Sequence, residues 1–312
     1  MPVPDRTTAA KPRMITVGGV CDSLIFAVDE LPPLPGKVLA SKLVHIVDGM
    51  ALSAGFAFVR LGGEAQVCAR VGDDHVGRTA RESLAAEGLD TSSLRSVAGA
   101  KTSVAVTLIE RTGHRLVVPY HDEAVDKSPT WLPLDDIARA DILHCDTRWV
   151  EGAEYAMRAA RERGVTTMLD GDVAPLEVLR RLVPLADYAV FSDGGLSIYA
   201  GCDDVDTALR RVAAEHDGHV GASCGERGYV WCEDGEIRSV PAPAVEVIDT
   251  LSAGDVFHGA LALALMEGRG VRDAARFACA AASLKCTRFG GRLGCPTRPE
   301  VDACVRATYG AD

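Results

Sequence analysis

Residues 249–259 read DTLSAGDVFHG, and this segment decides the fold that we expect for the chain. The five residues before it, AVEVI (244–248), are rich in β-branched side chains and predict a strand. The residues after it carry apolar side chains at the i, i+3, i+4 spacing of a helix. These positions are Phe257, Ala260, Leu261, Ala264 and Leu265. A strand that passes through a glycine turn into a helix is typical of α/β proteins.

The same segment has the chemistry of an anion site. Gly254 lets the backbone turn tightly before the helix. The first N–H groups of a helix lack internal partners, and the helix dipole is positive there. Ligands of open α/β sheets bind beyond the carboxyl ends of the strands, so Asp255 would lie where a phosphate meets a substrate hydroxyl. The helix dipole should keep Asp255 ionised. The alternative is that Asp249 and Asp255 are only a turn residue and a helix cap.

Composition narrows the class of protein. The chain has 312 residues, of which 47% are hydrophobic and 25% charged, with a net charge of −11. This length supports a large core, as one domain or two smaller ones. An acidic chain is a poor partner for nucleic acid or an anionic membrane, because phosphate contacts need clustered Lys and Arg. Residues 1–13 are polar and predict a disordered tail without a signal-peptide core. VFHGALALALM (256–266) is too short to span a bilayer, so a cytoplasmic protein is expected.

The ten cysteines are scattered singly, without a CxxC pair or a zinc-ligand spacing. Most lie in apolar strings such as ARFACAAASLKC (275–286), where a free thiol behaves as a small hydrophobic side chain. This pattern favours structural thiols over disulfides or a metal site.

Strand-like and helix-like segments alternate along most of the chain. Strands are predicted at 141–146, 165–172 and 188–193, with helices at 151–164, 176–186 and 205–218. This alternation predicts a mainly parallel sheet with helices on both faces, in one α/β domain over 14–312. Two segments, near 37–48 and 100–121, are strand-like without helices, and the second reads as a hairpin. We expect both to form a small second sheet that serves as a lid.

The string DTLSAGDVFHGAL resembles the C-terminal signature D-T-x-G-A-G-D of the PfkB (ribokinase-like) carbohydrate kinases, and the resemblance extends over nearly the whole chain. It implies the ribokinase-like fold and an ATP-dependent kinase that phosphorylates a hydroxyl of a small sugar with ATP and Mg²⁺. Asp255 would be the general base, and the backbone N–H groups of Ala253, Gly254 and Asp255 would form the anion hole. Ser252 replaces the first glycine of the signature, and because the anion hole uses backbone N–H groups, serine is admissible there if φ is negative, whereas a positive φ would disfavour it.

The same resemblance implies the binding residues. In VGGVCDSL, Asp22 would contact a sugar hydroxyl, and Asp48 and Gly49 lie where the family has its sugar-binding glycine turn. The nucleotide-binding residues would be Ser192, Ser223, Gly225, Gly228 and Thr250. VFSDGGL (190–196) lies where the family has N-x-x-E, so Asp193 is the nearest acid to order magnesium, with Asp249 as the other candidate. A monovalent cation near Asp249 and Cys286 stays open.

Within the family, CDTRWVEGA (145–153) and SLKCTRFGGRLGCP (283–296) are similar to the sulfofructose kinase branch. This implies a ketohexose with a remote anionic group, such as 6-deoxy-6-sulfofructose. Lys37 and Arg148 match positions that could face that anion, although either could be a solvated surface cation. Pro119 stands where the branch has a polar residue, so the substrate can differ.

Two other functions stay open at this point. One is a non-catalytic sugar-binding regulator, which Ser252 and the missing N-x-x-E glutamate favour, and the other is a nucleoside kinase on the same fold. In either case the apolar residues of the predicted lid, such as Val104, Val106 and Leu108, must be covered, which favours a homodimer joined through the lid.

Overall fold

A nine-stranded sheet forms the body of the protein in the computed structural model, which describes residues 10–31 and 36–310. The strand order is β13-β12-β11-β10-β9-β8-β1-β4-β5. The sheet is parallel from β5 to β11, and β12 and β13 join as antiparallel strands. The strands are β1 (Arg13–Val17), β4 (Glu64–Gly72), β5 (Leu94–Val97), β8 (Ile142–Cys145), β9 (Thr166–Gly171), β10 (Tyr188–Ser192), β11 (His219–Ser223), β12 (Tyr229–Glu233) and β13 (Glu236–Val240).

Helices cover both faces of this sheet, so its parallel strands are nearly continuous apolar runs. One core contains α1 (Met50–Arg60), α2 (His75–Ala86), α8 (Ala253–Met266), α9 (Val271–Cys286) and α10 (Arg298–Tyr309). The other contains α3 (Leu134–Ile137), α4 (Val150–Glu162), α5 (Leu176–Leu182), α6 (Asp193–Ala200) and α7 (Val205–Ala213). Short 3₁₀ turns lie at η1 (Val183–Leu185), η2 (Gly225–Arg227) and η3 (Gly291–Gly294). The predicted α/β class is confirmed.

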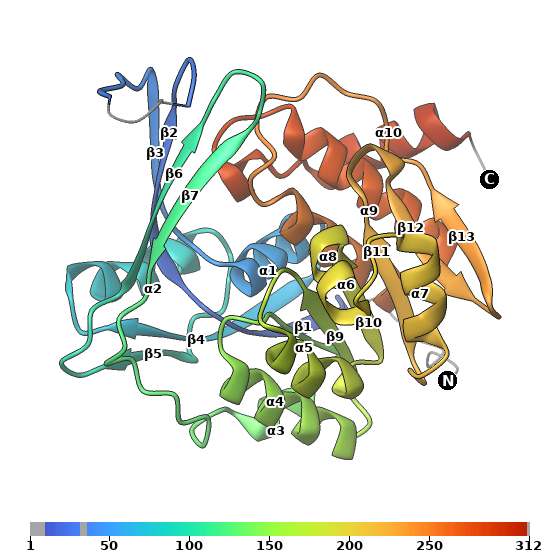
Figure 1. Ribbon diagram of the computed structural model, residues 1–312. Coiled ribbons are helices and arrows are strands. Elements are labelled where there is room, and N and C mark those ends of the chain that lie inside the picture. The colour runs from blue at the N-terminus through green and yellow to red at the C-terminus, as the bar shows by residue number, and fades with distance from the viewer. Residues whose placement is uncertain (1–9, 32–35, 311–312) are drawn as a thin grey trace.

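A separate four-stranded sheet, the lid, has the order β3-β2-β6-β7. In Figure 1 its blue and green strands rise along one side of the body. Its strands are β2 (Cys21–Ala27), β3 (Lys42–Asp48), β6 (Ser103–Ile109) and β7 (Arg115–Tyr120). The two predicted segments do share one sheet, but β2 lies between them. β3 also begins at Lys42, later than the predicted boundary at 37, and residues 36–40 form no strand.

The two faces of the lid differ in burial. On the inner face, Ile25 is fully buried and approaches Gly291, while Ala105, Thr107 and Ile109 are also buried. The outer face carries Leu43, Leu116, Val118 and Tyr120, each about half exposed to solvent (47–58%). The lid therefore packs one face on the body and leaves an apolar face uncovered.

Other predictions are corrected by the structure. Arg13 begins β1, so the disordered tail predicted for 1–13 does not reach that far, and residues 1–9 lie outside the described part. AVEVI (244–248) forms no strand. Instead, the N–H groups of Ile248 and Asp249 both donate to the Cys286 carbonyl at the end of α9 (2.8 and 3.1 Å). All ten cysteines are free, as predicted. Over the described residues, the helices fall short of the length and apolarity needed to cross a bilayer.

Candidate active site

The amino end of α8 follows the loop from Asp249 to Ser252, which contacts the hairpin turn of the lid. The Ala253 N–H donates to the Thr250 carbonyl at 3.3 Å, whereas the N–H groups of Gly254 and Asp255 have no acceptor among the described residues. Gly254 is exposed, and a Cβ on it would meet no atom within 4 Å. The predicted anion hole is therefore open at two of its three N–H groups, and Ala253 is already engaged.

Ser252 adopts the left-handed conformation at the N-cap of α8, with φ 59° and ψ 14°. The condition under which serine was admissible here, a negative φ, is therefore not met. Only Ser252 and Asp234 have a positive φ among the described residues other than glycine. A left-handed residue with a Cβ costs about 1–2 kcal/mol, so the turn is held in this shape by its surroundings.

The Asp255 carboxyl group, in the first turn of α8, has a pKa well above its usual range. Burial is the largest cause, and the negative charge of Asp48 adds to it. A hydrogen bond from the Ser252 side chain opposes the shift. The helix dipole was expected to favour the ionised form of Asp255, whereas burial and the neighbouring carboxylates act in the opposite direction and raise its pKa.

Asp48 and Gly49 lie at the start of α1, where the charge of Asp48 reaches Asp255. The Ser53 hydroxyl donates to Asp48 Oδ1 (2.6 Å), and Asp48 is buried. A Cβ on Gly49 would lie 2.2 Å from the Gly19 carbonyl oxygen, so only glycine fits. The structure therefore brings Asp48 close to Asp255, as the sugar side of the site requires.

Asp146, which the sequence analysis did not single out, organises this side. It follows β8, is fully buried, and accepts N–H groups from Gly19 (3.2 Å), Ala51 (3.1 Å) and Arg148 (2.8 Å). A carboxylate with three backbone donors joins the loop after β1, the start of α1 and the loop after β8. Its position directly after a predicted strand was the signal that could have revealed it.

Asp22 lies on the face of β2 opposite Ser23 and Ile25. Strand alternation puts Ser23 on the inner face of the lid with Ile25, and Asp22 on the outer face, where its carboxylate contacts His45 Nε2 at 2.5 Å. Ser23 is buried and takes the inward position. Asp22 nevertheless stays close to Asp48, because it pairs with Val47 in the lid and both carboxyl groups act on the pKa of the Cys21 thiol between them.

Arg148 lies in the loop between β8 and α4, beside Asp172. Its guanidinium donates to Asp172 Oδ2 (2.9 Å) and to the Val173 carbonyl (3.1 Å), and its Nε approaches the Met50 sulfur (3.2 Å). Lys37 is exposed in the connection between β2 and β3, which leaves the hairpin at the end opposite Asp48. Among the described residues, no contact joins Lys37 to Arg148, so the structure does not build one anion pocket from the two.

The nucleotide-side residues gather at the carboxyl ends of β10 and β11. Ser192 and Ser223 are paired in the sheet register. Ser192 also caps α6 by accepting the Gly195 N–H (3.0 Å). Gly225 (φ 52°) and Gly228 (φ 80°) form the tight turn after β11, and a Cβ on Gly228 would lie 2.1 Å from the Val240 carbonyl oxygen. The structure brings these four residues together at the carboxyl ends of β10 and β11.

Thr250, in the loop before α8, contacts the lid. The Arg115 guanidinium, at the start of β7, donates to Thr250 Oγ1 (2.6 Å), and the Thr250 hydroxyl approaches the Gly113 carbonyl (3.3 Å). The hairpin turn of the lid thus touches the loop that leads into α8. Sequence analysis missed Arg115, because a cation at a hairpin end carries no signal of what the hairpin meets.

The two predicted metal ligands differ in burial and in hydrogen bonding. Asp193 is exposed in the first turn of α6, with Oδ1 on the Gly194 N–H (2.8 Å), so a solvated Mg²⁺ could reach its carboxylate. Asp249 is fully buried and already engaged at both oxygens. Oδ1 accepts the Leu251 N–H (2.7 Å), and Oδ2 accepts the N–H groups of Gly290 and Gly291 (2.9 Å each). A buried carboxylate with three backbone donors is a structural clamp rather than a magnesium ligand.

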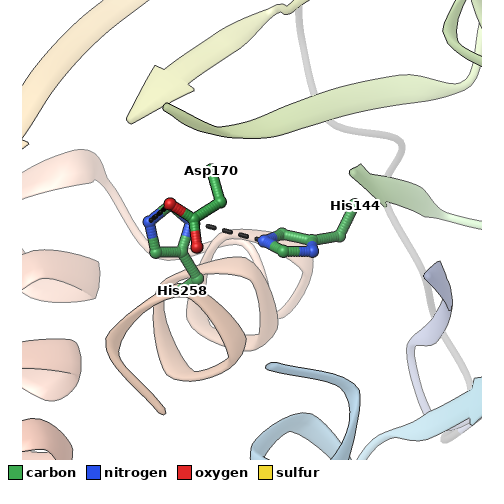
Figure 2. Close-up of side chains that lie close together, drawn as sticks. All are labelled: His144, Asp170 and His258. Carbon is green, nitrogen blue, oxygen red and sulfur yellow. Dashed lines mark hydrogen bonds and ion pairs between the residues drawn. The ribbon is translucent and has the colours of Figure 1, made fainter. Parts of the chain in front are cut away.

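Behind Asp255, a buried row of polar side chains connects α8 to the sheet (Figure 2). His258 Nε2 lies 3.5 Å from Asp170 Oδ1, and His258 Nδ1 lies 3.4 Å from His144 Nε2. Burial and the charge of Asp255 raise the pKa of Asp170, while burial lowers the pKa of His258 to about 4. Burial thus favours the neutral form of each of the three side chains.

Comparison with known proteins places these features in a family. The family model described as "pfkB family carbohydrate kinase" matches residues 11–298. The ribokinase of Haemophilus influenzae is 27% identical over 276 residues, which cover 85% of this chain and 90% of that protein. The crystal structure of a candidate ribokinase from Agrobacterium tumefaciens is 36% identical, with a TM-score of 0.93, covering 97% of this chain and all of the other.

A further solved structure, ribokinase from Arabidopsis thaliana complexed with ribose and ATP, has the same fold. Its TM-score is 0.80 at 22% identity, and the match covers 95% of this chain and 99% of the other. Because the family model matches residues 11–298, which is nearly the whole chain, the chain belongs to the pfkB family of carbohydrate kinases, phosphotransferases that act on an alcohol group.

Proposed function

We propose that this kinase transfers the γ-phosphoryl group of ATP to a hydroxyl of a ketohexose that carries an anionic group at its remote end, such as 6-deoxy-6-sulfofructose. The observation that carries the transfer is Asp255, a partly exposed carboxyl group with a raised pKa beside two unpaired helix N–H groups. A base and an anion hole on one helix turn are the two parts that phosphoryl transfer to an alcohol needs.

The sugar would lie under the lid, against Asp48, Gly49 and the inward Ser23. The Ser53 hydroxyl donates to Asp48 Oδ1, so Asp48 Oδ2 can accept a hydrogen bond from a sugar hydroxyl. Asp255 takes the proton of the attacking hydroxyl, and its raised pKa makes it a stronger base than an ordinary aspartate. The N–H groups of Gly254 and Asp255 hold the negative charge that develops on the transferred group.

ATP would lie along Ser192, Ser223, Gly225 and Gly228, with its phosphates directed to α8. Arg115 and Thr250 lie where the lid meets the loop before α8, so a bound phosphate would contact both. Mg²⁺ would neutralise phosphate oxygens, and Asp193, next to Ser192, has a carboxylate open to solvent. A solved relative of the same fold is complexed with ribose and ATP, which supports a sugar and a nucleotide as the two ligands.

The anionic group of the sugar rests on Arg148 alone. Its guanidinium is about one-third exposed, and its planar fork can donate two N–H bonds to a sulfonate or phosphate. It would have to exchange Asp172 for the substrate. Lys37 has no such position, and we do not include it in the site.

The substrate can be tested with a panel of sugars. ADP release would be measured with ribose, fructose, fructose 6-phosphate and 6-deoxy-6-sulfofructose, using wild type and Arg148→Ala. We expect the anionic ketohexoses to have the highest kcat/KM. Arg148→Ala should lower kcat/KM for them by roughly 10–150-fold, the worth of a charge-assisted hydrogen bond, and change fructose little. A preference for neutral sugars, or an equal loss on both, would remove the anionic substrate and keep the sugar kinase.

A further inference from the structure

A buried ammonium group lies against the loop that leads into α8. Lys285, in the last turn of α9, is 0% exposed. Its Nζ donates to the Asp249 carbonyl oxygen at 2.7 Å and lies 3.2 Å from Asp249 Oδ2. The carbonyl oxygen and one carboxylate oxygen of Asp249 therefore both contact the Lys285 ammonium group.

These oxygens are the ligands that a free metal cation would use. Hard cations bind backbone carbonyl and carboxylate oxygens, and sequence analysis left a monovalent cation open beside Asp249 and Cys286. The position does not suit a free ion in this chain, because the ammonium already contacts both oxygens. The oxygens of Asp249, beside which the sequence left a monovalent cation open, contact a side chain of the protein instead.

The neighbouring contacts show what the charge does. Asp249 clamps Leu251, Gly290 and Gly291 through its two oxygens. The Cys286 carbonyl, next to Lys285, accepts the N–H groups of Ile248 and Asp249. One turn of α9 therefore fixes the start of this loop twice, by a carbonyl and by an ammonium, and the loop continues into the strained Ser252.

We propose that Lys285 is a tethered cation that replaces a free monovalent ion beside Asp249, so that the loop from Asp249 to Asp255 keeps its shape without K⁺ or Na⁺. Lys285 is a positioning residue, since its contacts are to the loop that leads into α8. The effect on turnover rests on the proposed kinase function, whereas the effect on cation binding does not.

Burial is the largest influence on the ammonium and lowers the pKa of Lys285, and the positive charge of Arg115 from the lid acts in the same direction. Asp249 opposes this shift, with its carbonyl oxygen and Oδ2 at 2.7 and 3.2 Å from Nζ. A methionine at this position has similar length without charge, so it would leave these oxygens without a cation in a buried site.

The test compares wild type, Lys285→Met and the exposed control Lys101→Met in chloride salts of K⁺, Na⁺, NH₄⁺ and tetramethylammonium at one ionic strength. Thermal unfolding is the first readout, because it needs no turnover. Wild type and the control should unfold at the same temperature in all four salts. Lys285→Met should gain stability with K⁺ or NH₄⁺ in a saturable way, as expected for ligand binding to the folded state.

ADP release is the second readout. Wild type should keep its kcat within about twofold between K⁺ and tetramethylammonium, and Lys285→Met should lose at least about tenfold in tetramethylammonium and recover part of it in K⁺ or NH₄⁺. A wild-type enzyme that is stabilised or activated by K⁺ would overturn the proposal, and so would a Lys285→Met variant that ignores every cation. If Lys285→Met does not fold, the wild-type measurements still decide, and Lys285→Gln repeats the variant arm. Absence of turnover with every sugar would refute the function and leave the unfolding test intact.

Discussion

At the scale of single residues, Asp255 is the proposed general base, and its surroundings shift its pKa strongly. Its pKa is raised by burial and by Asp48, so this carboxyl group resists ionisation. The native state then binds this proton more tightly than the unfolded state, and stability falls as pH rises from the unfolded pKa of about 3.9 through the raised native pKa.

Asp255→Asn should therefore be more stable than wild type at pH 7, and the difference should shrink as pH falls towards 4. The amide keeps the shape of the side chain and has no charge to desolvate. Thermal unfolding at several pH values, without ligands, measures the difference. Equal stability of the two proteins from pH 5 to 8 would mean that the Asp255 carboxyl group is not perturbed.

Ser252→Gly separates two effects of one residue. Glycine adopts the left-handed conformation freely, so the variant should gain up to about 1 kcal/mol in the free energy of unfolding. It also removes the hydrogen bond that lowers the pKa of Asp255, so the acid limb of the kcat/KM profile should move to higher pH. Urea unfolding and a pH–rate profile check the two parts. An acid limb that moves to lower pH would contradict the assigned hydrogen bond.

At the scale of elements, α8 is tied to the sheet by the row His144–His258–Asp170 (Figure 2). If Asp170 is protonated, it donates to His258, and His258 donates to His144. Asp170→Asn keeps a donor in this place and should change the free energy of unfolding at pH 7 by less than about 1 kcal/mol. Asp170→Leu should cost more, because it leaves buried imidazole nitrogens unsatisfied. A large loss in Asp170→Asn would show instead that Asp170 is ionised.

Sequence patterns predicted helices and strands well where the apolar periodicity of a segment matches its burial in the fold. The alternating units, the hairpin at 103–120 and the helix after Gly254 are in this class. β2 was missed as a lid strand, because apolar alternation does not say which sheet a strand joins. AVEVI was wrongly predicted as a strand, since β-propensity describes the fit to a pleated surface and this segment has no partner strand.

The site was predictable in part for similar reasons. The carboxylate at the mouth of α8 follows from a glycine turn and a helix pattern, and both lie within one short segment. The position of Asp22 on the outer face depends on strand alternation, where a shift of one residue exchanges the two faces. Lys285 near a helix end reads as an exposed cation that offsets the dipole, and only the packing of α9 on the Asp249 loop buries it.

At the scale of the whole molecule, the lid leaves an apolar outer face. Leu43, Leu116, Val118 and Tyr120 share this face, and β7 is an edge strand with exposed backbone groups. We expect a homodimer joined through the lids. Light scattering at micromolar concentration should give twice the chain mass, and Val118→Glu should give a monomer, with Val173→Glu as an exposed control away from the lid. A wild-type monomer at high micromolar concentration would contradict this assembly.

The central claim is that Asp255 accepts the proton of the sugar hydroxyl in an ATP-dependent transfer. The most direct measurement is the single-turnover rate of sugar phosphorylation by wild type and Asp255→Asn, with ATP and sugar at saturating concentration. Asn keeps the hydrogen-bonding shape and cannot accept a proton, so the rate should fall at least about 10²-fold while binding of ATP and sugar changes little. If Asp255→Asn phosphorylates the sugar within a few-fold of wild type, Asp255 is only the helix cap and the claim is wrong.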